Sequence, residues 1–296
     1  MPSQIVDVLR KIRQKLNVVA MPAPSLMLQF DATTNQLKQA LIKLGFSDVV
    51  EVALGADLTS INEAEEFLEN VATGKQPLMT TSCCPAWVRA VSLHAPNLGT
   101  YVSSTGSPMK YTGDLVKQRY PDAITVFIGP CTAKRTEGIS LENVDHVLTA
   151  EELLCIFQAA EIDPKTMLDE ELGTTRIPSQ EGSQYCQTQN VTQAVIVAVP
   201  KASERIKSKS QELGEDLKEI QPIFISPLDK RAFKQLRQWN DDISSVPGNL
   251  IEVMCCDGGC VGGSGNISAP QTSVARLKTI LPKRPLFNDI EDIENL

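Results

Sequence analysis

Three short loops contain six of the eight cysteines in this 296-residue chain, and each loop follows a run rich in β-branched residues. The loops are T-S-C-C-P-A-W at residues 81–87, G-P-C-T-A-K-R-T-E at 129–137 and E-V-M-C-C-D-G-G-C-V-G-G at 252–263. Thiolates grouped in glycine- and proline-rich turns commonly hold a metal or carry out redox chemistry. The fold must therefore place thiols from three separated turns where they can act.

Short apolar runs alternate with helical patterns along the whole chain. The candidate strands cover residues 17–21, 48–53, 77–81, 124–128, 146–148, 194–199, 222–225 and 250–254. The candidate helices cover residues 3–16, 33–44, 61–71, 85–94, 108–119, 150–160, 203–213, 227–238 and 272–280. This alternation favours an α/β fold with a largely parallel, buried sheet. All three cysteine loops then begin at the carboxyl ends of strands, where open α/β sheets bind ligands.

The composition excludes several classes of protein. Hydrophobic residues make up 42% of the chain and charged residues 22%, as in ordinary globular proteins. The net charge of -8 argues against nucleic-acid binding, which needs a concentrated basic surface. No apolar run has the length of a membrane span or a signal peptide, so we expect a cytoplasmic protein without membrane contacts. In that compartment cysteines are thiols or metal ligands rather than disulfides.

The first two loops each suggest a chemical role for their residues. Pro85 suits the first position of a helix, because the N–H it lacks would have no partner there. Cys83 and Cys84 then lie at a helix N-terminus, which favours thiolate. In the second loop Lys134 and Glu137 follow the cysteine on one helical face. The lysine can donate to an anionic ligand, and the glutamate can move protons.

The loop cysteines could hold structural zinc or an iron–sulfur cluster. Zinc favours close Cys-x-x-Cys pairs, and the sequence has none. Ligands contributed by single turns, at Cys84, Cys131, Cys256 and Cys260, fit an iron–sulfur cluster in a crevice better. The glycines of the third loop would let the backbone approach something bulky.

The remaining cysteines and both histidines are expected to have no role in the site. Cys155 lies in the apolar helical run 153–157, where we expect a small buried hydrophobic side chain. Cys186 lies in an irregular stretch and carries no motif. His94 and His146 flank no motif either, and we expect them to be ordinary helix or strand residues.

The three loops resemble the active-site signatures of [FeFe]-hydrogenases, approximately T-S-C-C-P-x-W, P-C-x-x-K-x-x-E and E-x-M-x-C-x-x-G-C-x-x-G-G. All three occur in the same order, and the resemblance covers about residues 17–276. It implies one H-cluster domain over 1–296, an α/β fold of two intertwined lobes. Each lobe is expected to hold a mostly parallel four-stranded sheet flanked by helices, with the metal cluster in the crevice between them.

The lobes are expected to follow the chain order. The first lobe would cover about residues 17–162 and carry the first two cysteine loops. The second would cover 194–296 and carry the third loop. The polar stretch 163–193, which mixes Gly, Pro, Gln and Ser without a clear period, would connect them.

The resemblance also implies a cofactor and its ligands. It assigns four cysteines to a [4Fe-4S] cubane: Cys84, Cys131, Cys256 and Cys260. Cys260 would also bridge to a diiron subsite with CO, cyanide and azadithiolate ligands, completing the H-cluster. Lys134 would hydrogen-bond one cyanide, and Pro24 and Ser25 would lie near the other. Met254 and the apolar strand around it would keep the site dry, which tunes the potential.

The family's proton path can be carried over by spacing. Cys83 would be the proton donor that faces the azadithiolate nitrogen. Behind it, Glu63, Ser103 and Glu66 match the path's glutamate, serine and second glutamate. Without the resemblance, the two glutamates would be read as a solvated helical face. A thiol, water and two carboxyls can relay protons over short hops.

Four departures from the family pattern leave alternatives open. Gly129 stands where well-studied members carry methionine, and Met109 where they often carry glutamine. Ser264 interrupts the terminal glycine run, and no Gly-Gly-Val segment is visible in 180–193. The Gly-Pro-Cys form resembles a divergent branch called group B. An H2-sensing or redox-regulatory protein and a non-catalytic [4Fe-4S]-binding relative involved in iron–sulfur assembly therefore remain alternatives.

The main expectation is an anaerobic [FeFe]-hydrogenase, a ferredoxin hydrogenase that reversibly reduces protons to H2. Cys255 stands where the family often has alanine and is expected to be a bystander. No Cys-x-x-Cys-x-x-Cys run marks a ferredoxin-like domain, so the chain resembles a minimised catalytic core. Electrons would come directly from ferredoxin or a similar carrier, and hydrogenase maturation proteins would be further partners. The basic residues between Lys201 and Lys209 form one candidate docking patch.

Overall fold

The computed structural model describes residues 3–209 and 216–294, and its first sheet is fully parallel. The strand order is β2-β1-β4-β5. The strands are β1 (Val18–Pro22), β2 (Asp48–Val49), β4 (Ile124–Gly129) and β5 (His146–Thr149). Along β1, Val18 and Ala20 face one core while Val19 and Met21 face another. Burial on both faces explains why these strands read as continuous apolar runs.

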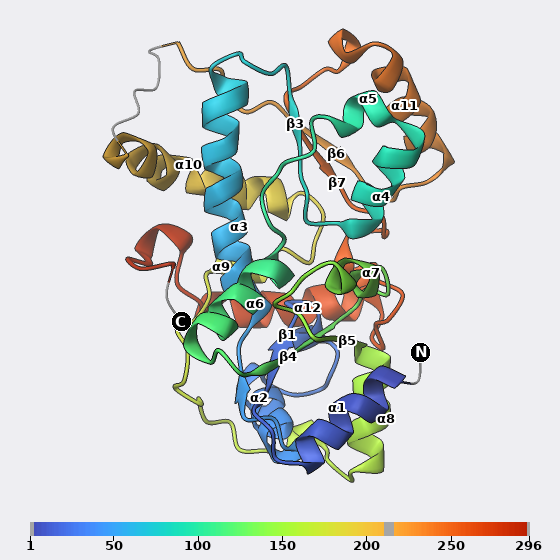
Figure 1. The fold of residues 1–296 in the computed structure, drawn as a ribbon, viewed down its shortest axis with the longest axis vertical. Coiled ribbons are helices and arrows are strands. Elements are labelled where there is room, and N and C mark those ends of the chain that lie inside the picture. Colours follow the sequence, from blue (N-terminus) through green and yellow to red (C-terminus); the bar gives the residue numbers. More distant parts are fainter. Residues whose placement is uncertain (1–2, 210–215, 295–296) are drawn as a thin grey trace.

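A second parallel sheet has the order β3-β7-β6. Its strands are β3 (Met79–Thr80), β6 (Pro222–Ile225) and β7 (Leu250–Val253). One face packs against helices through Trp87, Leu236 and Trp239. The two sheets and their helices form the two lobes visible in Figure 1.

Helices flank both sheets. They are α1 (Ser3–Arg13), α2 (Thr34–Leu44), α3 (Val52–Glu66), α4 (Pro85–His94), α5 (Pro96–Gly99), α6 (Pro108–Arg119), α7 (Lys134–Ile139), α8 (Ala150–Ala159), α9 (Gln180–Ser183), α10 (Asn190–Ser208), α11 (Lys230–Asp241) and α12 (Pro270–Ile280). Thr33 and Thr149 cap α2 and α8 in full capping boxes, which supply partners for amides at the two N-termini. No helix among the described residues is long and apolar enough to cross a membrane.

Helix α3 runs upright from the middle of the molecule along the upper lobe and packs against α6 and α10 (Figure 1). It begins just after β2 in the first sheet and is buried along almost its whole length. A Cβ at Gly55 would lie 2.2 Å from the Pro108 carbonyl oxygen, so only glycine allows α6 to approach this closely. Helix α3 is therefore the element that connects the lobes and carries Glu63 and Glu66 between them.

The structure confirms the α/β class and the parallel sheets but corrects one strand. Residues 194–199, expected as a strand, lie inside helix α10, so the second sheet has three strands in the described ranges rather than four. Val191, Ala194, Val195 and Ala198 are all buried in this helix. A short apolar run fits either a strand or a buried helix. Pro200, which follows the run, lies inside helix α10 and does not mark a boundary between two elements. Of the helix expected over 203–213, residues 210–213 lie outside the described ranges.

The structure also corrects the division into lobes. Met79 of β3 pairs with Leu250 of β7, so the first cysteine loop belongs to the same sheet as the third. The second loop follows β4 in the other sheet. A two-residue strand carries too little pattern to indicate its partner. The lobes are consequently intertwined, because the chain crosses between them more than once.

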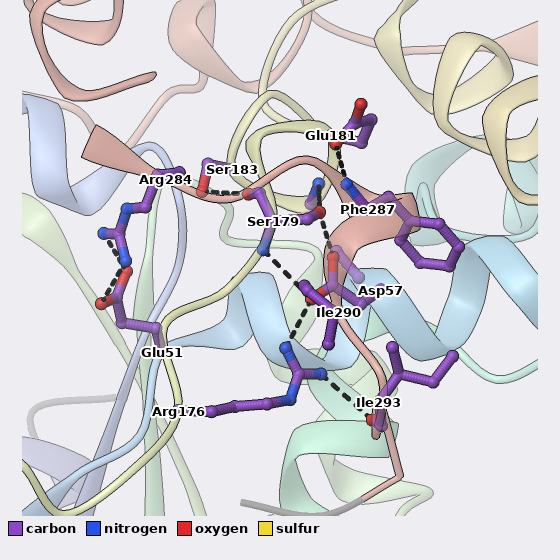
Figure 2. A network of polar contacts seen from close by, with 12 residues as sticks. Glu51, Asp57, Arg176, Ser179, Glu181, Ser183, Arg284, Phe287, Ile290 and Ile293 are labelled. Atoms are coloured by element: carbon purple, nitrogen blue, oxygen red, sulfur yellow. Dashed lines mark hydrogen bonds and ion pairs between the residues drawn. The ribbon is translucent and has the colours of Figure 1, made fainter. Parts of the chain in front are cut away.

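The connection 163–193 is held firmly rather than loosely (Figure 2). Buried Asp57 of α3 accepts hydrogen bonds from Arg176 at 2.9 Å and from the Ser179 amide at 3.2 Å. Arg176 also donates to the Ile293 carbonyl at 3.0 Å. Nearby, Arg284 and Lys38 both pair with buried Glu51, at 2.7 and 2.6 Å. These pairs fasten the connection and the C-terminal segment to the N-terminal half of α3.

Candidate active site and metal centre

The three cysteine loops meet at a cavity of about 310 Å³. Its wall is built from the residues that follow β1, β3, β4 and β7, as expected for the carboxyl ends of parallel strands. The predicted residues on this wall are Pro24, Ser25, Cys83, Cys84, Cys131, Lys134, Met254, Cys256 and Cys260. The structure thus gathers the predicted ligands in one place, and their individual roles stay predictions.

The donor set fits an iron–sulfur cluster. Four thiols from three loops surround one cavity, and thiolates are the usual ligands of such clusters. Within residues 3–209 and 216–294, no three His, Cys, Asp or Glu side chains gather closely enough to hold a single metal ion. The zinc alternative therefore has no four-ligand site in the described part of the chain.

The pKa values of three of these thiols are raised, as expected for cysteines grouped in a buried site. Burial raises the pKa of Cys131, and burial with neighbouring thiolates raises the pKa of Cys256 to about 11. The same two causes raise the pKa of Cys260 well above its usual value. Grouped thiolates repel one another unless positive metal ions lie between them, so metal binding and thiol deprotonation are coupled here.

Two glycines of the third loop explain how closely the loops pack. At Gly263 a Cβ would lie 2.7 Å from the Cβ of Pro130, in the second loop. At Gly259, where φ is +94°, it would lie 2.8 Å from the sulfur of Met254. These glycines let the loops approach one another, and both line the cavity, so their expected part in making room for a bulky ligand stays a prediction.

Lys134 is a buried cation on the cavity wall. Its ammonium lies 2.6 Å from Glu137 Oε2 and donates to the Cys83 carbonyl oxygen at 3.2 Å. Ser107 donates to the other oxygen of Glu137 at 2.5 Å. Burial alone would lower the pKa of Lys134, but the charge and hydrogen bond of Glu137, together with the nearby Cys83 and Cys131, outweigh it and raise that pKa. Glu137 thus keeps the lysine charged, and its expected part in proton movement stays a prediction.

Glu63 lies next to the Cys83 loop and is completely buried. Its Oε1 accepts from the Ser82 amide at 3.1 Å and from the Ser82 hydroxyl at 3.3 Å. Its Oε2 has no hydrogen-bond partner among the described residues. Burial raises the pKa of Glu63 to about 8, and burial together with the Glu63 charge raises the pKa of Cys83 well above its usual value. Both groups therefore hold protons near neutral pH, and for Cys83 this corrects the expectation that the helix N-terminus favours thiolate.

Ser103 and Glu66 lie further out and contact each other directly. Ser103 donates to Glu66 Oε2 at 2.6 Å, and Thr105 donates to the same oxygen at 2.9 Å. No hydrogen bond joins Ser103 to Glu63 in the described part of the chain. Ser82, which donates to the Thr105 carbonyl at 2.7 Å, lies between the two groups. The structure therefore adds Ser82 and Thr105 to the predicted set.

Sequence reasoning missed Tyr185 and Cys186, which both line the cavity. The Tyr185 hydroxyl lies 2.9 Å from the Ser60 hydroxyl, one helical turn before Glu63. Cys186 is buried, and its carbonyl oxygen accepts from the Val261 amide at 3.0 Å, next to Cys260. We expected no role for this cysteine, and the structure places it on the wall of the site. The connection carries no periodic pattern, so no sequence signal could have placed these residues.

Cys155 is exposed, contrary to expectation. Helix α8 turns Leu153, Ile156 and Phe157 towards the core, at the spacing of one helical face. Cys155 falls on the opposite side. The apolar run therefore does not bury every residue within it.

Gly129 and Phe127 explain one departure from the family pattern. A Cβ at Gly129 would lie 2.7 Å from two ring carbons of Phe127 and 3.0 Å from the Cβ of Ala23. Positions 127 and 129 point to the same face of β4. Phe127 lines the cavity, so its ring fills the space beside Gly129. Met109, the second departure, is fully buried and lines the same cavity.

Comparison with known proteins agrees with this geometry. Residues 16–264 match the family model for the iron only hydrogenase large subunit, C-terminal domain. Iron hydrogenase 1 of Clostridium pasteurianum is 28% identical over 261 residues, which cover 78% of this chain and 45% of that protein. The periplasmic [Fe] hydrogenase large subunit of Nitratidesulfovibrio vulgaris is 28% identical, over 95% of this chain and 78% of that one.

Other relatives are not described as hydrogenases. The cytosolic Fe-S cluster assembly factor NAR1 of Meyerozyma guilliermondii is 31% identical over 136 residues, which cover 43% of this chain and 25% of that protein. Among solved structures, a variant of [FeFe]-hydrogenase HydA1 from Chlamydomonas reinhardtii superimposes with a TM-score of 0.74 at 22% identity, over 93% of this chain and 88% of that one. With the family match spanning most of its length, the chain belongs to the iron-only hydrogenase large subunit, C-terminal domain family.

Proposed function

We propose that this chain is an [FeFe]-hydrogenase core that catalyses the reversible reduction of protons to H2. The observation that carries the proposal is the position of Cys83 beside buried Glu63, at a cavity lined by six further thiols, four of which are the proposed cluster ligands. A protein that only stores an iron–sulfur cluster needs the four ligands. It has no use for an additional protonated thiol or for a buried acid with a pKa of about 8.

The residues present fit an H-cluster. Cys84, Cys131, Cys256 and Cys260 would hold the [4Fe-4S] cubane, and Cys260 would be shared with the diiron subsite and its CO, cyanide and azadithiolate ligands. The Ser25 hydroxyl lines the cavity, is buried and has no hydrogen-bond partner among the described residues, as a donor awaiting a polar ligand would be. When bound, the H-cluster would pass on electrons received from a carrier and would provide the metal centre at which two protons combine.

The protein's own residues manage the protons. Cys83 keeps its proton because burial and the nearby Glu63 carboxyl disfavour the thiolate. After Cys83 gives up a proton, Glu63 can replace it, because a group with a pKa of about 8 exchanges protons readily near neutral pH. Ser82 bonds Glu63, and the half-buried Glu66 lies beyond it towards solvent. Ser82 and Thr105 mark the proposed route between solvent and cavity, although the hydrogen bonds among the described residues are not continuous from Glu63 to Glu66.

Other residues orient ligands and exclude water. The Lys134 ammonium is kept charged by Glu137 and can donate to an anionic ligand such as cyanide. Pro24 adds an apolar surface next to Ser25. Met109 and Met254 are buried on the wall, which strengthens the electrostatic interactions inside.

The proposed partners follow from this chemistry. We propose ferredoxin or a similar one-electron carrier as the source of electrons, and hydrogenase maturation proteins as the source of the diiron subsite. We also propose a cytoplasmic, anaerobic setting, since reduced thiols and an iron–sulfur cluster suit it.

Two alternatives remain. Similarity to the assembly factor NAR1 favours a protein that binds only the [4Fe-4S] cluster. Gly129 and Met109 instead favour a slow H2-sensing or redox-regulatory protein, because both lie at the cavity where well-studied catalytic members carry other residues.

Infrared spectroscopy of the chain coexpressed with hydrogenase maturases tests the proposal. CO and cyanide bands, together with rapid H2 evolution from reduced methyl viologen, would support the hydrogenase. Bands with very slow turnover would favour the sensor. A bound [4Fe-4S] cluster without CO and cyanide bands would contradict both the hydrogenase and the sensor. It would favour the relative that binds only the [4Fe-4S] cluster.

A further inference from the structure

Three of the four basic side chains in segment 201–209 are engaged in contacts within the protein. Lys201 donates to the carbonyl oxygens of Phe287 and Ile290. Arg205 and Lys209 both pair with Glu65, at 2.9 and 3.1 Å. These three cations already hold the C-terminal segment and α3, and the expected docking of an electron carrier at this segment stays a prediction.

A second basic surface lies on α11 and is free of such pairs. Four exposed cations make up what we call the α11 face: Lys230, Arg231, Lys234 and Arg237. None of them forms an ion pair within the described residues. Their spacing places Lys230, Lys234 and Arg237 on one side of the helix. Asp229 lies next to them, but its carboxylate is engaged in capping the first turn of α11.

The α11 face borders a groove of about 570 Å³ shared with α4. His94, at the end of α4, packs edge-on against Phe233 of α11 with ring centroids 5.3 Å apart. Lys230, Lys234 and Arg237 line this groove. In Figure 1, α4, α5 and α11 lie together in the upper lobe, and α10 lies beside α3.

Both helices are joined directly to the thiol-lined cavity. Cys84 is the N-cap residue of helix α4, and its carbonyl oxygen accepts from the Val88 amide at 3.1 Å. The turn before α11 contacts the third cysteine loop, since the Ser226 hydroxyl donates to the Cys256 carbonyl oxygen at 2.9 Å. The Leu228 amide also donates to the Cys255 carbonyl oxygen at 3.2 Å. A protein bound to this surface would therefore lie close to two of the proposed cluster ligands.

Charge indicates what kind of protein this would be. The whole chain has a net charge of -8, so most of its surface repels an acidic partner. The α11 face is a local exception, and opposite charges at an interface steer and orient association. Val88 and Leu93 of α4, 37% and 57% exposed, add apolar area of the kind found at the centre of interfaces.

We infer that the α11 face, together with exposed Arg89, Val88 and Leu93 of α4, docks an acidic one-electron carrier protein. The inference rests on the proposed hydrogenase function. Each encounter oxidises the carrier by one electron and reduces the domain by one. Two encounters supply the two electrons with which two protons form one H2, and the reverse reaction reduces two carriers.

A charge-reversal variant tests the surface. The variant Lys230→Glu/Lys234→Glu/Arg237→Glu is compared with the control Arg13→Glu/Lys43→Glu/Lys278→Glu. The control residues are exposed and form no ion pair in the described ranges. Both variants lower the net charge equally, so a difference between them reports the location of the charges and not their total.

Two measurements are made with a reduced bacterial ferredoxin as the probe. In H2 evolution by the matured protein, the KM for ferredoxin should be about tenfold higher for the α11 variant than for the parent. The KM of the α11 variant should also no longer depend on salt concentration. Its rate with methyl viologen, a small mediator that needs no docking surface, should stay unchanged. The control should keep the parental KM. Equal KM values for the two variants would overturn the inference.

Calorimetric titration separates this inference from the proposed function. It uses cluster-loaded protein and needs no turnover. Binding of ferredoxin weakened about tenfold in the α11 variant, but not in the control, would support the docking surface even if no H2 were formed. Ferredoxin binding that is equal in both variants, or absent from the parent, would overturn it.

Discussion

Lys134 donates a hydrogen bond to the carbonyl oxygen of Cys83 across 3.2 Å, and this contact joins the loops of two different sheets. Lys134 follows β4, whereas Cys83 follows β3. The same ammonium lies 2.6 Å from Glu137, which keeps it charged. The cation that faces the cavity therefore also sets the position of the proposed proton donor.

Removing this cation should destabilise the protein. Lys134→Met leaves the largely buried Glu137 without its partner, and we expect the free energy of unfolding to fall by roughly 2 kcal/mol. Urea unfolding of the metal-free protein measures the change. The double variant Lys134→Met/Glu137→Met should recover most of the loss, because both charges are then removed. If the single and double variants lose the same free energy of unfolding, the unpaired Glu137 charge is not the cause of the destabilisation.

Glu63 should make stability depend on pH. Its pKa is raised by burial from 4.5 to about 8, so between these values the folded protein holds a proton that the unfolded chain releases. Stability from this group is full below pH 4.5 and is lost as the pH rises towards 8. Glu63→Gln cannot release this proton, so its stability does not fall in this way. Relative to the parent, its free energy of unfolding should therefore increase by up to about 1.4 kcal/mol for each pH unit in this range. Urea unfolding between about pH 5 and 8.5 measures this, and parallel curves would contradict it.

Much of the site could be predicted because short stretches of sequence, with their cysteines, glycines and prolines, identify it. Pro85 begins helix α4 and Pro130 directly follows β4, so the cysteines next to them lie near the carboxyl ends of parallel strands. Glu63 and Glu66 could be assigned only by resemblance, since their burial depends on α6 and α10 packing around α3. The sequence around them reads equally well as a solvated helix.

Other features depend on contacts between distant segments. The pairing of β3 with β7 joins Met79 to Leu250, and two residues carry no pattern that identifies the partner. The α10 segment was read as a strand because its apolar residues are buried on more than one side of the helix. Tyr185 enters the cavity wall because the Asp57–Arg176 pair fastens the connection to α3.

Substitutions of the adjacent residues Cys83 and Cys84 should have different effects on activity and on iron content. Cys83→Ala should lower H2 evolution by at least about a hundredfold with the iron content unchanged, because it removes a proton donor and no ligand. Cys84→Ala should lose cluster iron. Cys255→Ala is the control and should change neither quantity. Iron analysis and H2 assays measure these outcomes, and full activity of Cys83→Ala would remove the proton-donor role.

Gly129 should not tolerate the methionine found in catalytic relatives unless Phe127 changes too. A Cβ there would lie 2.7 Å from the Phe127 ring, so Gly129→Met forces the ring to shift and should cost about 1–3 kcal/mol of folding free energy. Phe127→Ala/Gly129→Met should recover a large part of that loss, since the methionine can enter the space that the ring leaves. Urea unfolding of the two variants and of Phe127→Ala measures the coupling. Additive effects would mean that the ring does not occupy the methionine's space, whereas strong coupling would explain the glycine as a consequence of Phe127.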